Sequence, residues 1–302
     1  MDFISIIVGI IAPIFLVIAA GVVMDRIFKL DINTLSKLNF YILVPAIVFI
    51  SIVDSKLALL HMGWVATFGA VLFICDFGVA QLWRLFPGTR GKASIMTLCT
   101  CFYNCGNYGI PFTILAFGKE YVGITASLMV CQNLLCFTVG LGMVQGRASS
   151  IKEFVGRFFR VPLVWAVIAA YIFRGLDIPV PAAIHKSMQI MAEAVVAMAL
   201  FTLGVQLART KLKNNLLSVS GIALGRLVIS PLIAFLLLRF CFHFSDTTSL
   251  VLTAIAGMPV AVNVFIIASE YNKDSSELAS QAVFATTCLS IVTLAMILLF
   301  GR

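Results

Sequence analysis

Long apolar segments separated by short polar connections recur along the whole chain. Each is close to the ~20 residues that an α-helix needs to cross the hydrocarbon core of a bilayer. The sixth is the weakest, because Arg174 closes it early. We count ten segments: 4–24, 33–53, 63–86, 93–117, 121–145, 161–174, 183–207, 218–242, 248–269 and 278–301. The pattern predicts an all-α integral membrane protein with ten transmembrane helices and no soluble domain.

Two of these segments contain residues that continue a helix poorly. The interruptions read Asn104-Cys105-Gly106-Asn107-Tyr108-Gly109-Ile110-Pro111 in the fourth segment and Gly257-Met258-Pro259-Val260-Ala261-Val262-Asn263 in the ninth. Proline has no N–H to donate and clashes with the preceding turn, and backbone freed at membrane depth needs protein or water around it. We expect the helix breaks at Gly106, Gly109, Pro111, Gly257 and Pro259. Broken membrane helices commonly form the substrate sites of transporters.

Composition and charge agree with this pattern and orient it. The chain is 61% hydrophobic and 11% charged, whereas a soluble domain carries about 25% charged residues. Connections after odd-numbered segments hold 14 Lys and Arg residues, and the other connections with the C-terminus hold 6. The positive-inside rule then places both termini outside, in a multi-pass protein of the plasma (inner) membrane. The net charge of +8 reflects this asymmetry and does not indicate nucleic-acid binding.

The chain also repeats itself. Three pairs of residues share an offset of 148 to 150 positions: Pro13 with Pro162, Pro111 with Pro259, and Asp76 with Arg226. A unit of five spans is odd-numbered, so its second copy enters the membrane from the opposite side, as in many secondary carriers. We therefore expect two inverted repeats, 1–146 and 161–302; chance agreement among nine prolines is the alternative.

Residues 147–160 join the two halves. Ser150 and Glu153 fit a capping box that starts a helix. The apolar residues that follow keep helical spacing, with basic residues elsewhere on the turn. This predicts an amphipathic helix on the cytoplasmic membrane surface, acting as a structural link.

The amide side chains around the breaks are the first candidates for substrate binding. A broken helix leaves a half-helix N-terminus with free N–H groups and partial positive charge, which suits a carboxylate. The alternative is that the amides only satisfy the broken backbone, and that the aromatic ring packs between helices rather than on a substrate. The candidates are Asn104, Asn107, Tyr108, Gln132, Asn133 and Asn263.

Three ionisable residues lie within predicted spans: Asp76, Glu193 and Arg226. Charge is costly there, so each is a candidate for coupling or for an internal charge. Asp76 could hold a proton, or it could accept hydrogen bonds from loose amides at the break. Arg226 could pair with the substrate or, equally well, with an acidic side chain.

Other classes of function find little support. The eight cysteines lie mostly within spans, which does not suggest a disulfide framework, and Cys99, Cys101 and Cys105 lack zinc-site spacing and histidine partners. No metal or other cofactor is predicted. No Ser/His, paired-Asp or metal-binding set indicates an enzyme, and no Walker motif indicates ATP drive.

The motifs resemble those of a known family. The interruption from Asn104 to Pro111 matches an Asn-x-Gly-x-x-Gly-x-Pro pattern, and Tyr41–Ala46 in the second span matches too. The end of the chain adds Met258-Pro259-Val260-Ala261, Ala268-Ser269-Glu270-Tyr271, Ala279-Ser280 and Thr287-Cys288-Leu289-Ser290. Together, in this order, they are similar to the auxin efflux carrier family, which includes bacterial permeases and the plant PIN exporters.

The resemblance implies a bile-acid-symporter-like fold of ten spans, in which spans four and nine cross at their prolines and organic anions bind beside the crossing. In it, Asp76 resembles an aspartate near the crossing of the plant exporters. Glu193 falls in span seven next to the crossing, as a second titrating group. The long cytoplasmic loop of the plant exporters is absent, which is closer to prokaryotic members and does not indicate auxin as the substrate.

These observations predict a secondary transporter of small organic anions such as monocarboxylates or dicarboxylates. It would work by alternating access, through an elevator-like or a rocking motion. An ion- or proton-gated channel or sensor on the same scaffold is the alternative. The expected partners are the substrate, a co-transported proton or sodium ion, the lipid bilayer and a second copy of the chain in a homodimer.

Overall fold

The computed structural model describes residues 3–55, 59–86, 88–140, 142–143, 156, 159–210, 215–271 and 273–301. Within these ranges the chain is helical apart from its connections and one isolated β-bridge. Seven helical stretches are long and apolar enough to cross a membrane: Phe3–Phe28, Ile32–Val53, His61–Arg84, Lys119–Gly140, Ala182–Ala208, Leu216–Phe240 and Ser275–Phe300. The predicted all-α, multi-pass membrane protein is confirmed. Most of the predicted linker, 147–160, lies outside the described residues.

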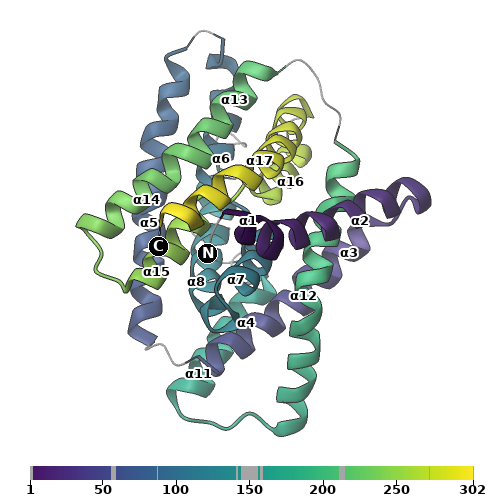
Figure 1. The fold of residues 1–302 in the computed structure, drawn as a ribbon, viewed down its shortest axis with the longest axis vertical. Helices are drawn as coiled ribbons and strands as arrows, with labels where there is room; N and C mark the ends of the chain where they lie inside the picture. The colour runs from purple at the N-terminus through teal and green to yellow at the C-terminus, as the bar shows by residue number, and fades with distance from the viewer. Residues whose placement is uncertain are drawn as a thin grey trace.

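The elements follow one another without any sheet in the described part of the chain (Figure 1). The first half contains α1 (Phe3–Ile6), η1 (Ile7–Ile11), α2 (Ala12–Phe28), α3 (Ile32–Leu38), η2 (Asn39–Leu43), α4 (Val44–Val53), α5 (Leu59–Ala80), η3 (Gln81–Arg84), η4 (Arg90–Lys92), α6 (Ala93–Cys101), η5 (Cys105–Gly109), α7 (Ile110–Ala116), η6 (Lys119–Tyr121), α8 (Val122–Leu135) and η7 (Cys136–Gly140). The second contains α11 (Pro162–Gly175), α12 (Ala182–Ala208), α13 (Leu216–Leu224), η8 (Gly225–Ile229), α14 (Ser230–Phe240), α15 (Asp246–Ala256), α16 (Val262–Tyr271) and α17 (Lys273–Phe300).

Four prolines lie directly after a π-helical turn instead of breaking a helix. In each case the residue before the proline donates its N–H to the carbonyl five residues back: Ala12 to Ile7, Val44 to Asn39, Ile110 to Cys105 and Ser230 to Gly225. A proline ring crowds the carbonyl of the preceding turn, and a wider turn is a common way to relieve this. The spans therefore continue through Pro13, Pro45, Pro111 and Pro231.

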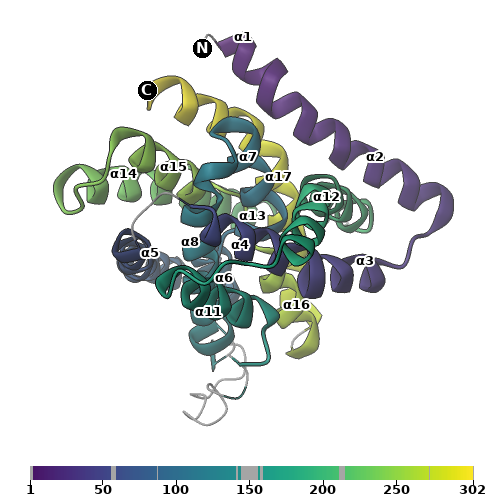
Figure 2. The ribbon, with the colours of Figure 1, turned by 90° about the horizontal axis from the view of Figure 1, so that it is seen from below.

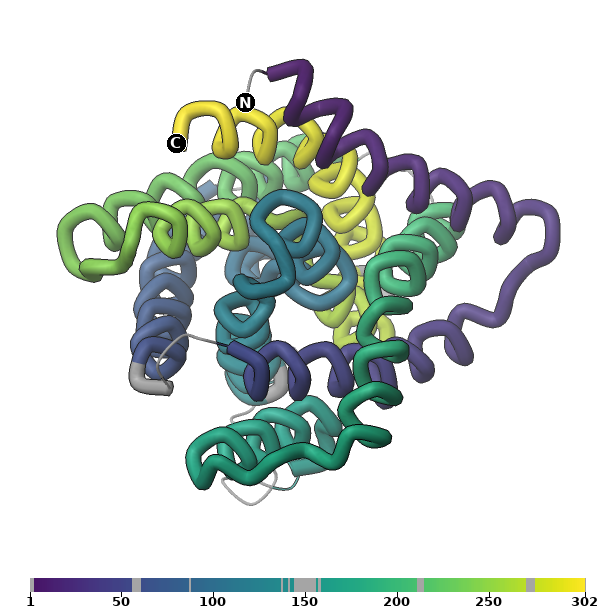
Figure 3. Tube along the Cα trace, turned by 60° about the horizontal axis from the view of Figure 1, so that its bottom comes forward, coloured from purple at the N-terminus to yellow at the C-terminus, as the bar shows by residue number. Residues whose placement is uncertain are grey.

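The helices pack in two groups. The first consists of α2, α4, α11 and α12, in which α12 lies against both α2 and α4, and α11 against α4. The second consists of α5 to α8 with α13 to α17. Figures 2 and 3 show α12 beside α2, and they show the two chain termini close together, where α1 contacts α17.

Two interrupted helices lie at the centre of the second group. Helix α6 ends at Cys101 and α15 at Ala256, and each is followed by a short extended stretch before the next helical segment. Tyr103 and Val260 form an antiparallel bridge between these stretches. The N–H of Asn104 donates to the carbonyl of Pro259, and that of Ala261 to the carbonyl of Phe102, both at 2.9 Å. The two breaks thus satisfy each other's backbone, as the membrane interior requires.

The position of the first break differs from the prediction. Gly257 and Pro259 lie in the interruption that follows α15, as expected. The first interruption is at Phe102–Asn104, whereas Gly106, Gly109 and Pro111 lie in the helical turns after it. The physical reason is that Pro111 follows a π turn at the start of α7, where its missing N–H leaves the helix continuous.

Candidate functional site

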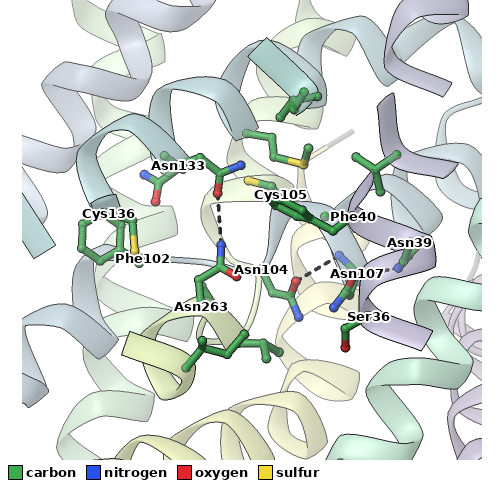
Figure 4. A pocket seen from close by; sticks show the side chains of 18 of the residues that line it. Ser36, Asn39, Phe40, Phe102, Asn104, Cys105, Asn107, Asn133, Cys136 and Asn263 are labelled. Carbon is green, nitrogen blue, oxygen red and sulfur yellow. Dashed lines mark hydrogen bonds between the residues drawn. The ribbon is translucent and has the colours of Figure 1, made fainter. Parts of the chain in front are cut away.

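A cavity of about 480 Å³ lies between the two groups of helices. One wall comes from α3, η2 and the start of α4, with Leu163 of α11 and Gln206 of α12. The opposite wall comes from the first extended stretch and η5, from the region where α8 passes into η7, and from the start of α16 (Figure 4). Segments far apart in the sequence therefore meet at one site beside the paired breaks.

Five of the six predicted binding residues line this cavity: Asn104, Asn107, Gln132, Asn133 and Asn263. The Asn263 Nδ2 donates to Asn133 Oδ1 at 3.1 Å, and Figure 4 shows this pair bridging the cavity wall. Asn104 acts as the N-cap of η5, since its Oδ1 accepts the N–H of Asn107 at 3.1 Å. The side-chain oxygen of Asn104 therefore satisfies a backbone N–H at the break, as one alternative predicted. The Asn104 Nδ2 has no partner among the described residues.

Tyr108 is placed differently. Its side chain is fully buried and does not line the cavity. The ring stacks on Phe112 with 6.5 Å between centroids, and the hydroxyl accepts a hydrogen bond from Ser290 at 3.2 Å. The structure thus shows Tyr108 in helix packing.

Several buried polar atoms around the cavity have no hydrogen-bond partner among the described residues. They are Asn39 Oδ1, Tyr103 Oη, Asn104 Nδ2, Gln132 Oε1, Gln132 Nε2 and Gln206 Oε1. Leaving one buried donor or acceptor unsatisfied costs about 1–3 kcal/mol. Buried polar groups in proteins are nearly always paired with protein, water or a ligand, so these atoms are available to pair with water or with a ligand in the cavity.

Sequence reasoning missed polar residues on the wall that contains α3 and η2, among them Asn39, Gln206 and Lys37. Asn39 is 2% exposed and donates to Asn107 Oδ1 at 3.0 Å. Gln206 lies near the end of α12, and Lys37 lies exposed on α3 at the mouth of the cavity. The first two could have been found, because an amide inside an apolar span is itself unusual.

The electrostatic character of the cavity is positive. Among the described lining residues, Lys37 is the one basic residue, and there is no Asp or Glu. The helical segments that start at Cys105 and Val262 both begin at the cavity wall. Helix N-termini carry partial positive charge. The cavity is therefore suited to a small anion with hydrogen-bonding oxygens.

Asp76 and Arg226 lie together but away from the cavity lining. Both side chains are buried, with 1% and 0% exposed, and Arg226 Nη1 lies 3.4 Å from Asp76 Oδ2. Ser230 Oγ donates to the same carboxylate oxygen at 2.8 Å. Of the alternatives for Arg226, the structure shows pairing with an acid. Neither residue is among those that line the cavity.

Glu193 is not brought into contact with either cluster. Its carboxylate lies 4.0 Å from the Lys119 ammonium. Both side chains are largely exposed, Lys119 at 71% and Glu193 at 67%. An exposed pair at this distance contributes little free energy. The structure thus separates Glu193 from the paired breaks, where the resemblance had placed it.

Comparison with known proteins identifies similar chains. Residues 150–298 match a family described as "Membrane transport protein". A "Putative malonate transporter" of Rhizobium meliloti is 25% identical over 77% of this chain and 74% of its own length. An "Uncharacterized transporter" of Methanothermobacter thermautotrophicus is 24% identical over 87% of both chains. The "Uncharacterized transporter YfdV" of Escherichia coli is 22% identical over 88% of both.

Proposed function

This chain belongs to the membrane transport protein family, and from that premise we propose that it is a secondary transporter of small organic anions. The family match confirms the resemblance to the auxin efflux carriers that the motifs indicated. Small dicarboxylates are the substrates we favour, because the cavity suits an anion and one relative is named a "Putative malonate transporter".

One observation carries this proposal. The cavity beside the paired breaks is lined by buried amide atoms without partners and by Lys37, with no acidic residue among its described lining. An amide left unpaired is stabilised when a carboxylate accepts its hydrogen bond, and such charge-assisted bonds are stronger than neutral ones. The arrangement therefore favours the binding of an anionic or strongly polar ligand there.

We further propose that the two groups of helices move relative to each other during transport. The chain would consist of two inverted five-span repeats, with the broken spans α6–α7 and α15–α16 crossing at their extended stretches. The cavity lies between the groups, so a displacement of one group would carry its wall from one membrane face to the other. Its mouth at α3 lies on the face that the basic residues place in the cytoplasm, which corresponds to an inward-open state.

Counterflow in liposomes tests the function. Protein in vesicles loaded with unlabelled malonate should take up labelled malonate with saturation. Lys37→Gln should raise the KM about fivefold, because a charge near the surface contributes ~1 kcal/mol, and the difference should shrink at high salt.

Lys37→Arg retains the charge and serves as the matched control, with a KM near that of the wild type. Conductance that does not saturate with malonate would instead mark a channel. Absence of uptake for malonate and for a panel of monocarboxylates would contradict the proposal that small organic anions are carried.

Orientation is predicted from the same asymmetry of basic residues. In a cysteine-free background, Asn33→Cys at the cavity mouth should react with a membrane-impermeant thiol reagent only from the cytoplasmic face. Lys186→Cys on α12 should react only from outside, since both positions are exposed on opposite ends of the spans. The reverse labelling of both would invert the proposed topology. Labelling of both from one face would contradict the repeat.

A further inference from the structure

The Arg226 guanidinium is fully buried and is surrounded by oxygen atoms from four different elements. Its Nη1 donates to the carbonyl of Thr100 at 2.5 Å and faces Asp76 Oδ2 at 3.4 Å. Its Nη2 donates to the Ser230 hydroxyl and to the carbonyl of Ala256. These four oxygens, which we call the oxygen cage, bring together α5, α6, α14 and α15.

Both cage carbonyls lack the N–H that would pair with them in a continuous helix, because α6 and α15 are interrupted here. In a continuous helix the carbonyl of Thr100 would accept from the N–H of Asn104, four residues on. That N–H donates to Pro259 instead, at 2.9 Å. The two cage carbonyls thus belong to the last turns of their helices, where the helix dipole adds partial negative charge.

The carbonyl of Ala256 also lacks its helical partner. Ala256 is the last residue of α15, and its carbonyl would accept from the N–H of Val260 in a continuous helix. The N–H of Val260 donates to Thr286 Oγ1 at 3.1 Å. A positive charge is therefore stabilised at the point where the C-terminal ends of α6 and α15 meet the Asp76 carboxylate.

Two carbonyls, a carboxylate and a hydroxyl are the ligands that a hard cation takes. In carriers with broken helices, unwound carbonyls and half-helix C-termini commonly coordinate a coupling Na⁺. Here a guanidinium, which stays protonated in proteins and cannot leave, occupies that position. The Tyr103 ring, which also lines the cavity, lies 4.7 Å from the Arg226 Cζ and separates the cage from the substrate cavity.

We propose that Arg226 is a tethered cation that takes the place of a coupling ion in the oxygen cage. Its consequence for transport, which rests on the proposed function, is that no Na⁺ moves with the substrate through this site. The role of Arg226 in the cage does not depend on which substrate is carried, because the guanidinium neutralises only the two helix ends and Asp76.

Thermal unfolding of the full-length protein in detergent tests the proposal without any substrate. Wild-type protein should unfold at the same Tm in NaCl as in choline chloride of equal concentration. Arg226→Ala opens the cage and leaves the Asp76 carboxylate without a cationic partner, so the Tm of this variant should be well below that of the wild type in choline chloride. NaCl should then raise that Tm by about 5 °C at a concentration ~100 times the Kd of the opened site.

Two matched variants isolate the cage. Arg226→Met fills the space without charge, and Arg226→Ala combined with Asp76→Asn removes the carboxylate ligand. Neither should gain stability from NaCl. Arg226→Ser, which offers a hydroxyl as an additional ligand, should respond to NaCl as Arg226→Ala does.

The proposal is overturned by any of three results: a Na⁺ effect on the wild type, no Na⁺-specific rise in either opened variant, or failure of both opened variants to fold in NaCl. Failure of malonate counterflow would count against the proposed function and leave these melting curves unaffected. Where wild-type counterflow is observed, it should proceed equally in Na⁺ and in choline.

Discussion

Gln132→Leu should reduce malonate uptake by about 10- to 100-fold in kcat/KM while leaving the protein at least as stable as wild type. The Gln132 side chain is 4% exposed, lines the cavity, and has no partner for either amide atom within the described structure. A hydrogen bond to a charged ligand contributes about 1.5–3 kcal/mol, which sets the expected loss. An apolar side chain of similar size removes an unsatisfied group, so the Tm should be unchanged or higher.

A neighbouring substitution gives the control. Met129→Leu also changes a cavity-lining residue of α8, but it conserves apolar character and approximate volume, which usually costs little. Uptake by this variant should stay near the wild-type rate. If Gln132→Leu transports as well as Met129→Leu does, the amide is not part of the substrate site. A Tm at or above that of the wild type shows that a loss of uptake is not caused by unfolding.

Gly204→Ala should destabilise the protein strongly, lowering its Tm by about 2–6 °C or preventing its accumulation in the membrane. A Cβ at this position would lie 2.0 Å from the Ile18 carbonyl oxygen, and one at Gly21 would lie 2.2 Å from that of Phe201. Both obstacles are backbone atoms, so no change of rotamer relieves them. Helices α2 and α12 must separate, and overpacking of this kind costs about 1–3 kcal/mol. In a chain of this size, each kcal/mol lowers the Tm by ~2 °C.

Gly63→Ala is the matched control, because a Cβ there would meet nothing within 4 Å. Alanine is the better helix former by roughly 0.5–1 kcal/mol, so this variant should be as stable as wild type or slightly more stable. Melting curves of both purified variants in the same detergent make the comparison. Equal Tm values would mean that α2 and α12 do not touch at their glycines in the purified protein.

The positions of seven apolar spans could be read from the sequence, because transfer into lipid depends on the residues of each segment alone. The ninth break was predicted at Gly257 and Pro259, where it is found. The fourth was predicted too late, because no local rule shows that the extended stretch at Phe102–Asn104 is held by hydrogen bonds to a partner more than 150 residues away. The repeat and the crossing stay predictions.

For the candidate site, the sequence by itself determined which amides are unusual in an apolar segment, and all five of the predicted amides line the cavity. It also determined that Asp76 and Arg226 are costly to bury. Only the tertiary structure decided that Tyr108 packs away from the cavity, that Asn39 and Gln206 complete its wall, and that Arg226 serves the open ends of two helices. The physical reason is that burial and charge are properties of a residue, whereas a hydrogen bond between distant elements depends on where the whole fold places them.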